Sequence, residues 1–161
     1  MGKEIERRFL VKGDGWRGLG QGVEYQQGFL STVKERVVRV RIAGEKATLT
    51  IKGISEGYSR LEFEYEIPKA DARILLNSLC ERPWIEKIRY RIPLGEVVWE
   101  VDEFHGDNQG LIMAEVELTD ENQQVELPSW VGREVSTDAR YFNASLVHTP
   151  YSLWGHTEPV D

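Results

Sequence analysis

Residues 60–67 read Arg60-Leu61-Glu62-Phe63-Glu64-Tyr65-Glu66-Ile67, with a charged side chain at every second position and an apolar one between. Successive side chains of a β-strand point to opposite faces, so this stretch predicts a strand with one charged and one apolar face. The same alternation recurs along the chain, with charges of both signs. The other stretches are Glu4/Glu6/Arg8, Arg39/Arg41, Lys52 two residues after Thr50, Lys87/Arg89/Arg91, Glu100/Asp102 and Glu115/Glu117.

Two arrangements produce such strands. An ordinary antiparallel sheet buries its apolar face and exposes its charges to water. That arrangement is disfavoured here because almost purely charged faces of both signs recur on strand after strand, with few Ser, Thr or Gln residues. The other arrangement is an inverted barrel, whose apolar outside is covered and whose charges converge on a hydrated lumen. Charges inside a barrel must meet opposite charges, a metal ion or water.

We therefore predict a mainly β (α+β) fold, an eight-stranded antiparallel closed barrel with a charged lumen and flanking helices. The predicted strands lie near 3–11, 23–31, 36–43, 46–52, 58–67, 85–93, 96–104 and 111–119. Helices are expected from Pro68 to about Leu79 and after Ser136, with a weaker candidate at 120–125. Residues 1–150 are expected to form one domain, and residues 151–161 an extended C-terminal tail.

Composition restricts the classes of function. The chain has 161 residues, of which 40% are hydrophobic and 29% charged, as in a globular domain. A net charge of −7 argues against nucleic acid as a partner, because such binding requires many Lys and Arg residues. No membrane span or signal-peptide core is found, and the single cysteine, Cys80, fits a reducing compartment. We expect a cytoplasmic protein that does not bind membranes.

A glycine-rich stretch formally matches the dinucleotide-binding pattern G-x-G-x-x-G. It runs from Gly13 to Gly18 and is followed closely by Gly20 and Gly22, so that no helix is expected to start there. The β-α-β context of a dinucleotide fold is also missing. We interpret this stretch as a loop.

The residue types of the predicted lumen indicate phosphate chemistry. Glu-rich sites with oxygen ligands favour Mg²⁺ or Mn²⁺, whereas Arg and Lys bind phosphate oxygens. Phosphoryl transfer needs both kinds of group together with an oriented nucleophile. No local signal indicates a Ser-His-Asp or Cys-His arrangement, so the simplest nucleophile is water. The expected partner is therefore a small polyanion that binds with a divalent cation.

Short motifs occur in a fixed order along most of the chain. The first is Glu4-Ile-Glu6-Arg-Arg8-Phe-Leu-Val, similar to an E-x-E-x-K signature. The others are Arg39-Val-Arg41, Thr50-Ile-Lys52, Arg60-Leu-Glu62-Phe-Glu64, Glu86-Lys87-Ile-Arg89-Tyr90, Glu100-Val-Asp102, Glu115-Val-Glu117 and Glu134-Val-Ser-Thr-Asp138-Ala-Arg140-Tyr141. Together these motifs resemble the CYTH family, the triphosphate tunnel metalloenzymes, and most closely its small bacterial tripolyphosphatases.

The resemblance implies a tunnel that hydrolyses a triphosphate by means of metal-activated water. The implied metal ligands are Glu4, Glu6, Glu115 and Glu117, with Glu62, Glu64 and Asp102 as further candidates. The implied phosphate-binding residues are Arg8, Arg39, Arg41, Lys52, Lys87 and Arg89. Glu4, Glu6, Arg8 and Lys87 are the implied catalytic residues. The substrate is expected to be tripolyphosphate, cleaved to pyrophosphate and phosphate, and a homodimer is left open.

Two positions depart from the family pattern and keep alternatives open. Arg8 replaces the signature lysine and cannot exchange a proton near neutral pH. Phe29 lies where small bacterial relatives often carry tyrosine. The alternative enzymes are a class IV-type adenylyl cyclase and a thiamine triphosphatase. The alternative from another class is a module that binds polyphosphate or nucleotide without turnover.

Overall fold

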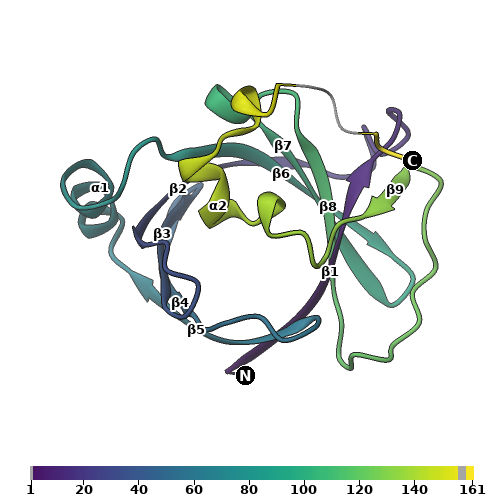
Figure 1. Cartoon of the computed structure of the whole chain (residues 1–161), viewed down its shortest axis with the longest axis horizontal. Helices are drawn as coiled ribbons and strands as arrows, with labels where there is room; N and C mark the ends of the chain where they lie inside the picture. Colours follow the sequence, from purple (N-terminus) through teal and green to yellow (C-terminus); the bar gives the residue numbers. More distant parts are fainter. Residues whose placement is uncertain (1, 156–158) are drawn as a thin grey trace.

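Antiparallel pairing of neighbouring strands closes the sheet into a barrel. The computed structural model describes residues 2–155 and 159–161. Strands follow the order β5-β4-β3-β2-β6-β7-β8-β1, and β5 pairs with β1 to close the ring (Figure 1). Their bounds are β1 Lys3–Val11, β2 Gly22–Ser31, β3 Val37–Ala43, β4 Lys46–Lys52, β5 Ser59–Ile67, β6 Ile85–Leu94, β7 Val97–Phe104 and β8 Ile112–Glu117. The predicted eight-stranded antiparallel barrel is confirmed.

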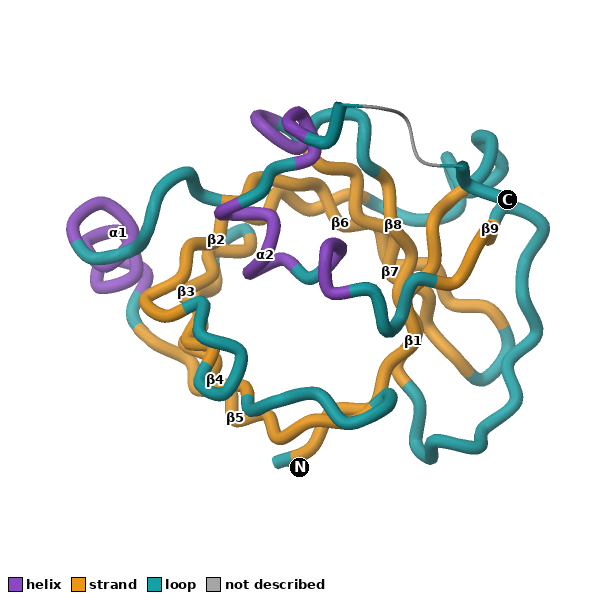
Figure 2. Tube along the Cα trace, in the orientation of Figure 1, coloured by secondary structure: helices purple, strands orange, loops and turns teal. Residues whose placement is uncertain are grey.

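The remaining elements surround this barrel. Strand β9 (Val131–Glu134) pairs with the end of β1, outside the ring. Helix α1 (Lys69–Ser78) lies outside the barrel, whereas α2 (Asn143–His148) lies across its opening (Figure 2). Three short 3-10 turns are η1 Gly106–Asn108, η2 Ala139–Tyr141 and η3 Tyr151–Leu153. None of the helices within the described residues is long and apolar enough to cross a membrane.

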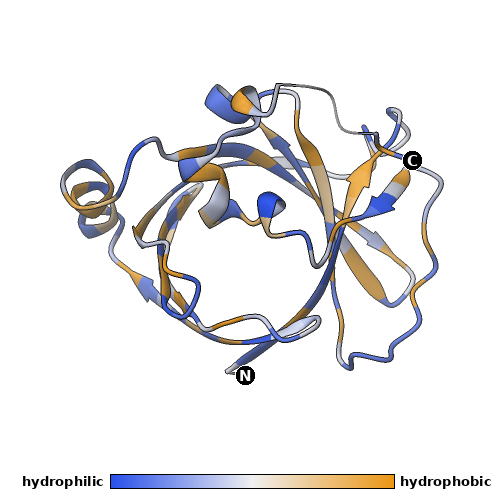
Figure 3. Ribbon diagram, in the orientation of Figure 1, coloured by the Kyte–Doolittle hydropathy of each residue, from blue (hydrophilic) through white to orange (hydrophobic). Residues whose placement is uncertain are grey.

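Hydrophilic and hydrophobic residues alternate along the barrel strands (Figure 3). Because successive side chains point to opposite faces, this alternation gives the barrel wall a polar and an apolar face. On the outside, α1 places Ala72 and Leu76, one helical turn apart, against Val40 and Ile42 of β3. A second outer cluster covers β1, β6, β7 and β8 and includes Trp99. Burial of this apolar surface contributes a large part of the favourable free energy of folding, since the charged part of the lumen holds few apolar groups.

One end of the lumen is apolar and holds α2 in place. Inward positions of the strands there carry Leu10, Phe29 and Ile85, which pack with Leu146 of α2. Residues beyond α2 add to this cluster, because Trp154 stacks edge-on against Tyr141. The charged part of the lumen therefore begins where this apolar plug ends.

The glycine-rich stretch at 13–18 is a loop, as expected, and it is anchored to the barrel. Trp16 is buried there and meets Tyr90 of β6 at a ring-centroid distance of 5.1 Å. Gly20 passes so close to β6 that a Cβ atom would lie 2.2 Å from the carbonyl oxygen of Arg91. The glycine therefore serves backbone packing.

Two local expectations were wrong. Residues 120–125 form turns without a helix, and β9 was not predicted, because a four-residue strand leaves almost no pattern to detect. The tail after Pro150 begins with η3 and packs on the barrel, and Val160 accepts a hydrogen bond from Arg133 of β9. Residues 156–158 of the predicted tail lie outside the described residues.

Matched leucine substitutions on α1 test this packing. Leu76 is fully buried, whereas Leu79 is 65% exposed. Leu76→Ala should lower the free energy of unfolding by about 2–5 kcal/mol, because it leaves a cavity against β3. Leu79→Ala should change it by only about 0.5 kcal/mol. Denaturant unfolding of both variants provides the comparison, and equal losses would contradict the packing described.

Candidate functional site

The lumen contains a cavity of about 630 Å³ that side chains from every barrel strand line. Its charged residues come from positions two apart on the strands, as the alternation predicts. The cations are Arg8, Lys34, Arg39, Arg41, Lys52, Arg60, Lys87 and Arg89. The carboxylates are Glu4, Glu6, Glu62, Glu64, Glu100, Glu115 and Glu117.

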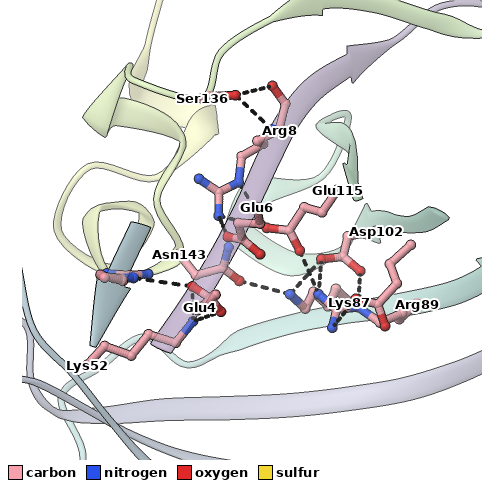
Figure 4. Close-up of polar contacts among 12 residues, drawn as sticks. Glu4, Glu6, Arg8, Lys52, Lys87, Arg89, Asp102, Glu115, Ser136 and Asn143 are labelled. Atoms are coloured by element: carbon pink, nitrogen blue, oxygen red, sulfur yellow. Dashed lines mark hydrogen bonds and ion pairs between the residues drawn. The ribbon is translucent and has the colours of Figure 1, made fainter. Parts of the chain in front are cut away.

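Arg8 connects two of the carboxylates (Figure 4). Its guanidinium donates to Glu115 Oε2 at 2.7 and 2.9 Å and to Glu6 Oε1 at 2.8 Å. The backbone N–H of Arg8 donates to the hydroxyl of Ser136, which lies just after β9. Arg8 thus keeps the positive charge of the signature lysine and spans two acids through one nitrogen, Nη2.

Asp102 holds a second pair of cations. Its carboxylate accepts from Lys87 Nζ at 2.7 Å and from Arg89 Nε and Nη2 at 2.7 and 2.9 Å. Arg89 also donates to Glu115, so the two ion-pair groups join into one network. Asp102 is almost fully buried and does not line the cavity. Its contacts favour a role in fixing the two cations, and its predicted role as a metal ligand stays a prediction.

Near the start of β1, Glu4 lies between two more cations. Its carboxylate accepts from Lys52 Nζ at 2.9 and 3.2 Å and from Arg60 Nε at 3.4 Å. Burial by itself would raise the pKa of Glu4, but Lys52, a contact with Glu62 and Arg60 together hold it well below its usual value. Burial and the contact with Glu4 raise the pKa of Glu62 to about 7.

Acids also face acids across this part of the sheet. Glu6 is the cross-strand partner of Glu117, and Glu100 is the partner of Glu115. Like charges directly opposite one another destabilise a sheet unless a cation compensates for them. Burial, followed by the charges of Glu115 and Glu4, raises the pKa of Glu6 to about 7. The β1–β8–β7 side therefore holds more negative charge than its own cations neutralise.

The chemistry of these donors fits a hard divalent cation, because all of them are carboxylate oxygens. Oxygens of Glu6 and Glu115 both lie within 2.8 Å of Arg8 Nη2, so they already approach a common point. No group of three or more acidic, His or Cys side chains in the described part of the chain is arranged to hold a metal ion as it stands. Binding of a metal would therefore require the ion pairs with Arg8 to rearrange.

Strands β3 and β6, on either side of β2, are rich in cations. Arg39 and Arg41 of β3 and Lys87 and Arg89 of β6 all line the cavity there. Burial, with the charges of Arg39 and Arg89, lowers the pKa of Arg41 to about 9, so the guanidinium stays charged at neutral pH. Burial is also the largest cause that lowers the pKa of Lys87, to about 7, despite the attraction of Asp102.

The structure brings together every predicted site residue, with Asp102 behind the wall of cations. Sequence reasoning missed Arg60, Gln27 and Asn143. Arg60 lies two residues before Glu62 and four before Glu64, so the alternation places it on the same face of β5 and made it detectable. Gln27 is uncharged, and Asn143 reaches the lumen from α2, so neither left a signal in the pattern of charges.

A barrel whose lumen combines clustered cations with carboxylates defines a polyanion tunnel, and comparison with known proteins agrees. The model of the CYTH domain matches residues 2–151, so the chain belongs to the CYTH family. An inorganic triphosphatase of Acetivibrio thermocellus is 52% identical over 94% of this chain and 97% of its own length. One from Nitrosomonas europaea is 35% identical over 89% of this chain and 95% of its own length. The solved structure of the inorganic triphosphatase NE1496 has a TM-score of 0.65 at 32% identity, covering 89% of this chain and 93% of that one.

The raised pKa of Glu6 predicts a pH dependence for the metal-free protein. Its pKa moves from 4.5 to about 7 on folding, so the folded state binds the proton more tightly between those values. The free energy of unfolding must then fall as the pH rises through this window. Glu6→Gln removes that loss, so in EDTA it should be more stabilising at pH 8 than at pH 5, by about 2–3 kcal/mol.

Denaturant unfolding at the two pH values measures this difference. Glu126→Gln, on an exposed loop, is the control for the change in charge. An effect of Glu6→Gln that is the same at pH 5 and pH 8 would show that Glu6 is not held in a site of excess negative charge.

Proposed function

We propose that this protein is a metal-dependent inorganic triphosphatase that cleaves tripolyphosphate to pyrophosphate and phosphate. The observation that carries the proposal is the composition of the lumen. Some of its strands carry clustered cations, and on others the carboxylates outnumber the cations that neutralise them. That arrangement suits a chain of phosphates carried with a divalent cation. The names of the two relatives described above, both inorganic triphosphatases, support the same substrate.

The cations would bind and orient the phosphate chain. Arg39, Arg41 and Lys52 lie on adjacent strands and offer donors to phosphate oxygens along one side. Arg8 of β1 and Lys87 and Arg89 of β6 would contribute further donors, each held by a carboxylate. Because strands hold these groups rigidly, little reorganisation is needed when charge develops in the transition state.

The reaction adds water to a terminal phosphorus and breaks its bond to the bridging oxygen, which leaves with pyrophosphate. Triphosphatases of the CYTH family are metal-dependent. When bound, a divalent ion supplies charge neutralisation and activation of water. We assign its binding to Glu4, Glu6, Glu115 and Glu117, with Glu62, Glu64 and Asp102 as further candidates. Asp102 meanwhile keeps Lys87 and Arg89 in place.

Several finer points stay predictions. Oxygen-only ligands support Mg²⁺ or Mn²⁺ as the metal ion. The content of a single cysteine supports a cytoplasmic location. The division into a domain of residues 1–150 and a tail of residues 151–161 and the formation of a homodimer also rest on the sequence alone.

A product assay tests the proposal. The purified protein is incubated with tripolyphosphate, thiamine triphosphate or ATP, each with Mg²⁺, Mn²⁺ or EDTA, and the products are resolved. We expect metal-dependent release of phosphate, fastest from tripolyphosphate, and none from Glu6→Gln, which keeps the shape of the side chain and removes the charge. Cyclic AMP from ATP would indicate an adenylyl cyclase, and fastest turnover of thiamine triphosphate would indicate a thiamine triphosphatase. Binding without turnover of any substrate would indicate a binding module.

Substitution of Arg41 separates binding from chemistry. Arg41→Ala should raise the KM for tripolyphosphate about tenfold to a hundredfold, because hydrogen bonds to charged groups contribute about 1.5–3 kcal/mol. Arg91→Ala is the matched control, since that side chain is 64% exposed at the rim. Steady-state kinetics of both variants decide the point, and an unchanged KM for Arg41→Ala would place the phosphates elsewhere.

A further inference from the structure

Arg41 differs from the other strand-borne cations of the lumen in its partners. Within the described residues, each of these lumen cations except Arg41 has a carboxylate within ion-pair distance. Arg41 Nε donates instead to the neutral side-chain oxygen of Gln27 at 2.8 Å, and its guanidinium lies over the ring of Tyr25, 4.7 Å from the centroid. The other cations pair with Glu6 and Glu115 (Arg8), Glu64 (Arg39), Glu4 (Lys52 and Arg60) and Asp102 (Lys87 and Arg89).

The reason lies in the position of β2. This strand lies between β3 and β6, the two strands that carry Arg39, Arg41, Lys87 and Arg89. Its own inward positions are Tyr25, Gln27 and Phe29, none of which is charged. On most other strands of the barrel, inward-facing acids lie next to the lumen cations. Here, a neutral strand separates two cationic ones.

Asn143 of α2 extends this neutral strip. Its side-chain Oδ1 accepts from Lys87 Nζ at 3.0 Å (Figure 4). The same oxygen accepts from Gln27 Nε2 at 2.7 Å. Gln27 is fully buried, whereas Asn143 lines the cavity. The two amides therefore form an uncharged bridge from Arg41 to Lys87.

The partners determine the orientation of both amides. Arg and Lys side chains carry donors only, so each must face an amide oxygen. The oxygen of Gln27 then points to Arg41 and its nitrogen to Asn143, whose oxygen also serves Lys87. The bridge is satisfied in one arrangement, as expected for groups that fix their neighbours.

We propose that Gln27 and Asn143 are positioning residues that hold Arg41 ready for the substrate without cancelling its charge, and that Asn143 ties this arrangement to Lys87. An amide oxygen satisfies a donor as a carboxylate does, but it adds no negative charge to repel a phosphate. The β3–β2–β6 wall thereby becomes an anion subsite, which borders the acidic β7–β8–β1 side where β6 pairs with β7. This inference rests on the proposed function, which it deepens by placing one end of the phosphate chain.

Asn143→Asp is the sharpest test, because both neighbours of Oδ1 are donors and an aspartate accepts both hydrogen bonds unchanged. The variant should keep its fold, with an unchanged or higher melting temperature. Its Kd for tripolyphosphate, measured by calorimetry in EDTA, should rise at least tenfold. A merely structural role predicts no loss of binding, since the contacts persist.

Asn77→Asp, on the exposed surface of α1, makes the same change in charge outside the lumen and should bind within twofold of the unaltered protein. Unchanged binding by Asn143→Asp would overturn the inference, as would absence of binding by the unaltered protein in EDTA. If Asn143→Asp does not fold, Gln27→Glu, which keeps the acceptor for Arg41 but loses the donor to Asn143, is judged by its Kd for tripolyphosphate alone, with Gln26→Glu, which faces Arg73 of α1, as its control.

Binding in EDTA is independent of turnover. If the protein binds tripolyphosphate but releases no phosphate with any metal, the proposed function is wrong. The role of Gln27 and Asn143 would still be decided by the binding of their variants. A protein that hydrolyses tripolyphosphate and whose Asn143→Asp form binds it normally would fail the inference alone.

Discussion

Charge burial inside a closed barrel is the constraint on which this structure depends. An unpaired ion in such a place costs several kcal/mol, so each inward charge must find a partner. Most do so across the sheet, as in Arg8 with Glu115 and Arg89 with Asp102. Within the described residues, pairing is incomplete at the facing acids Glu6 and Glu117, which share the nearby cations with other acids, and at Arg41, which has no carboxylate partner. The two acids lie on strands β1 and β8 and Arg41 on β3, and in the proposed function a metal ion and a phosphate chain would supply the missing charges there.

The same constraint explains the outside of the barrel. The charged part of the lumen contributes little hydrophobic stabilisation, so the favourable free energy of folding must come from the outer wall and from the apolar end of the lumen. Leu76 of α1, Trp16 of the glycine-rich loop and Trp99 of β7 bury that wall. Leu146 closes one end of the lumen and thereby brings Asn143, three residues earlier, to Lys87. The apolar packing of α2 at the end of the lumen thus sets the position of Asn143 in the candidate site.

Period-two alternation was enough to predict the barrel, because inward and outward residues differ so sharply in charge. It placed Glu4, Arg41, Lys52 and the other charged residues in one lumen, and the family motifs assigned their roles. It did not show which charges pair, since register across strands depends on tertiary closure. Asn143 was beyond reach, because its contact with Lys87 spans 56 residues and comes from a six-residue helix.

A crystal structure with tripolyphosphate and Mn²⁺ tests the central claim most directly. The account predicts an anomalous manganese peak within about 2.0–2.3 Å of carboxylate oxygens near Glu6 and Glu115, with the phosphate chain reaching Arg41. Arg8 should then have left at least one of its two carboxylates. Phosphate bound outside the barrel, or manganese remote from Glu6 with every lumen ion pair unchanged, would contradict it.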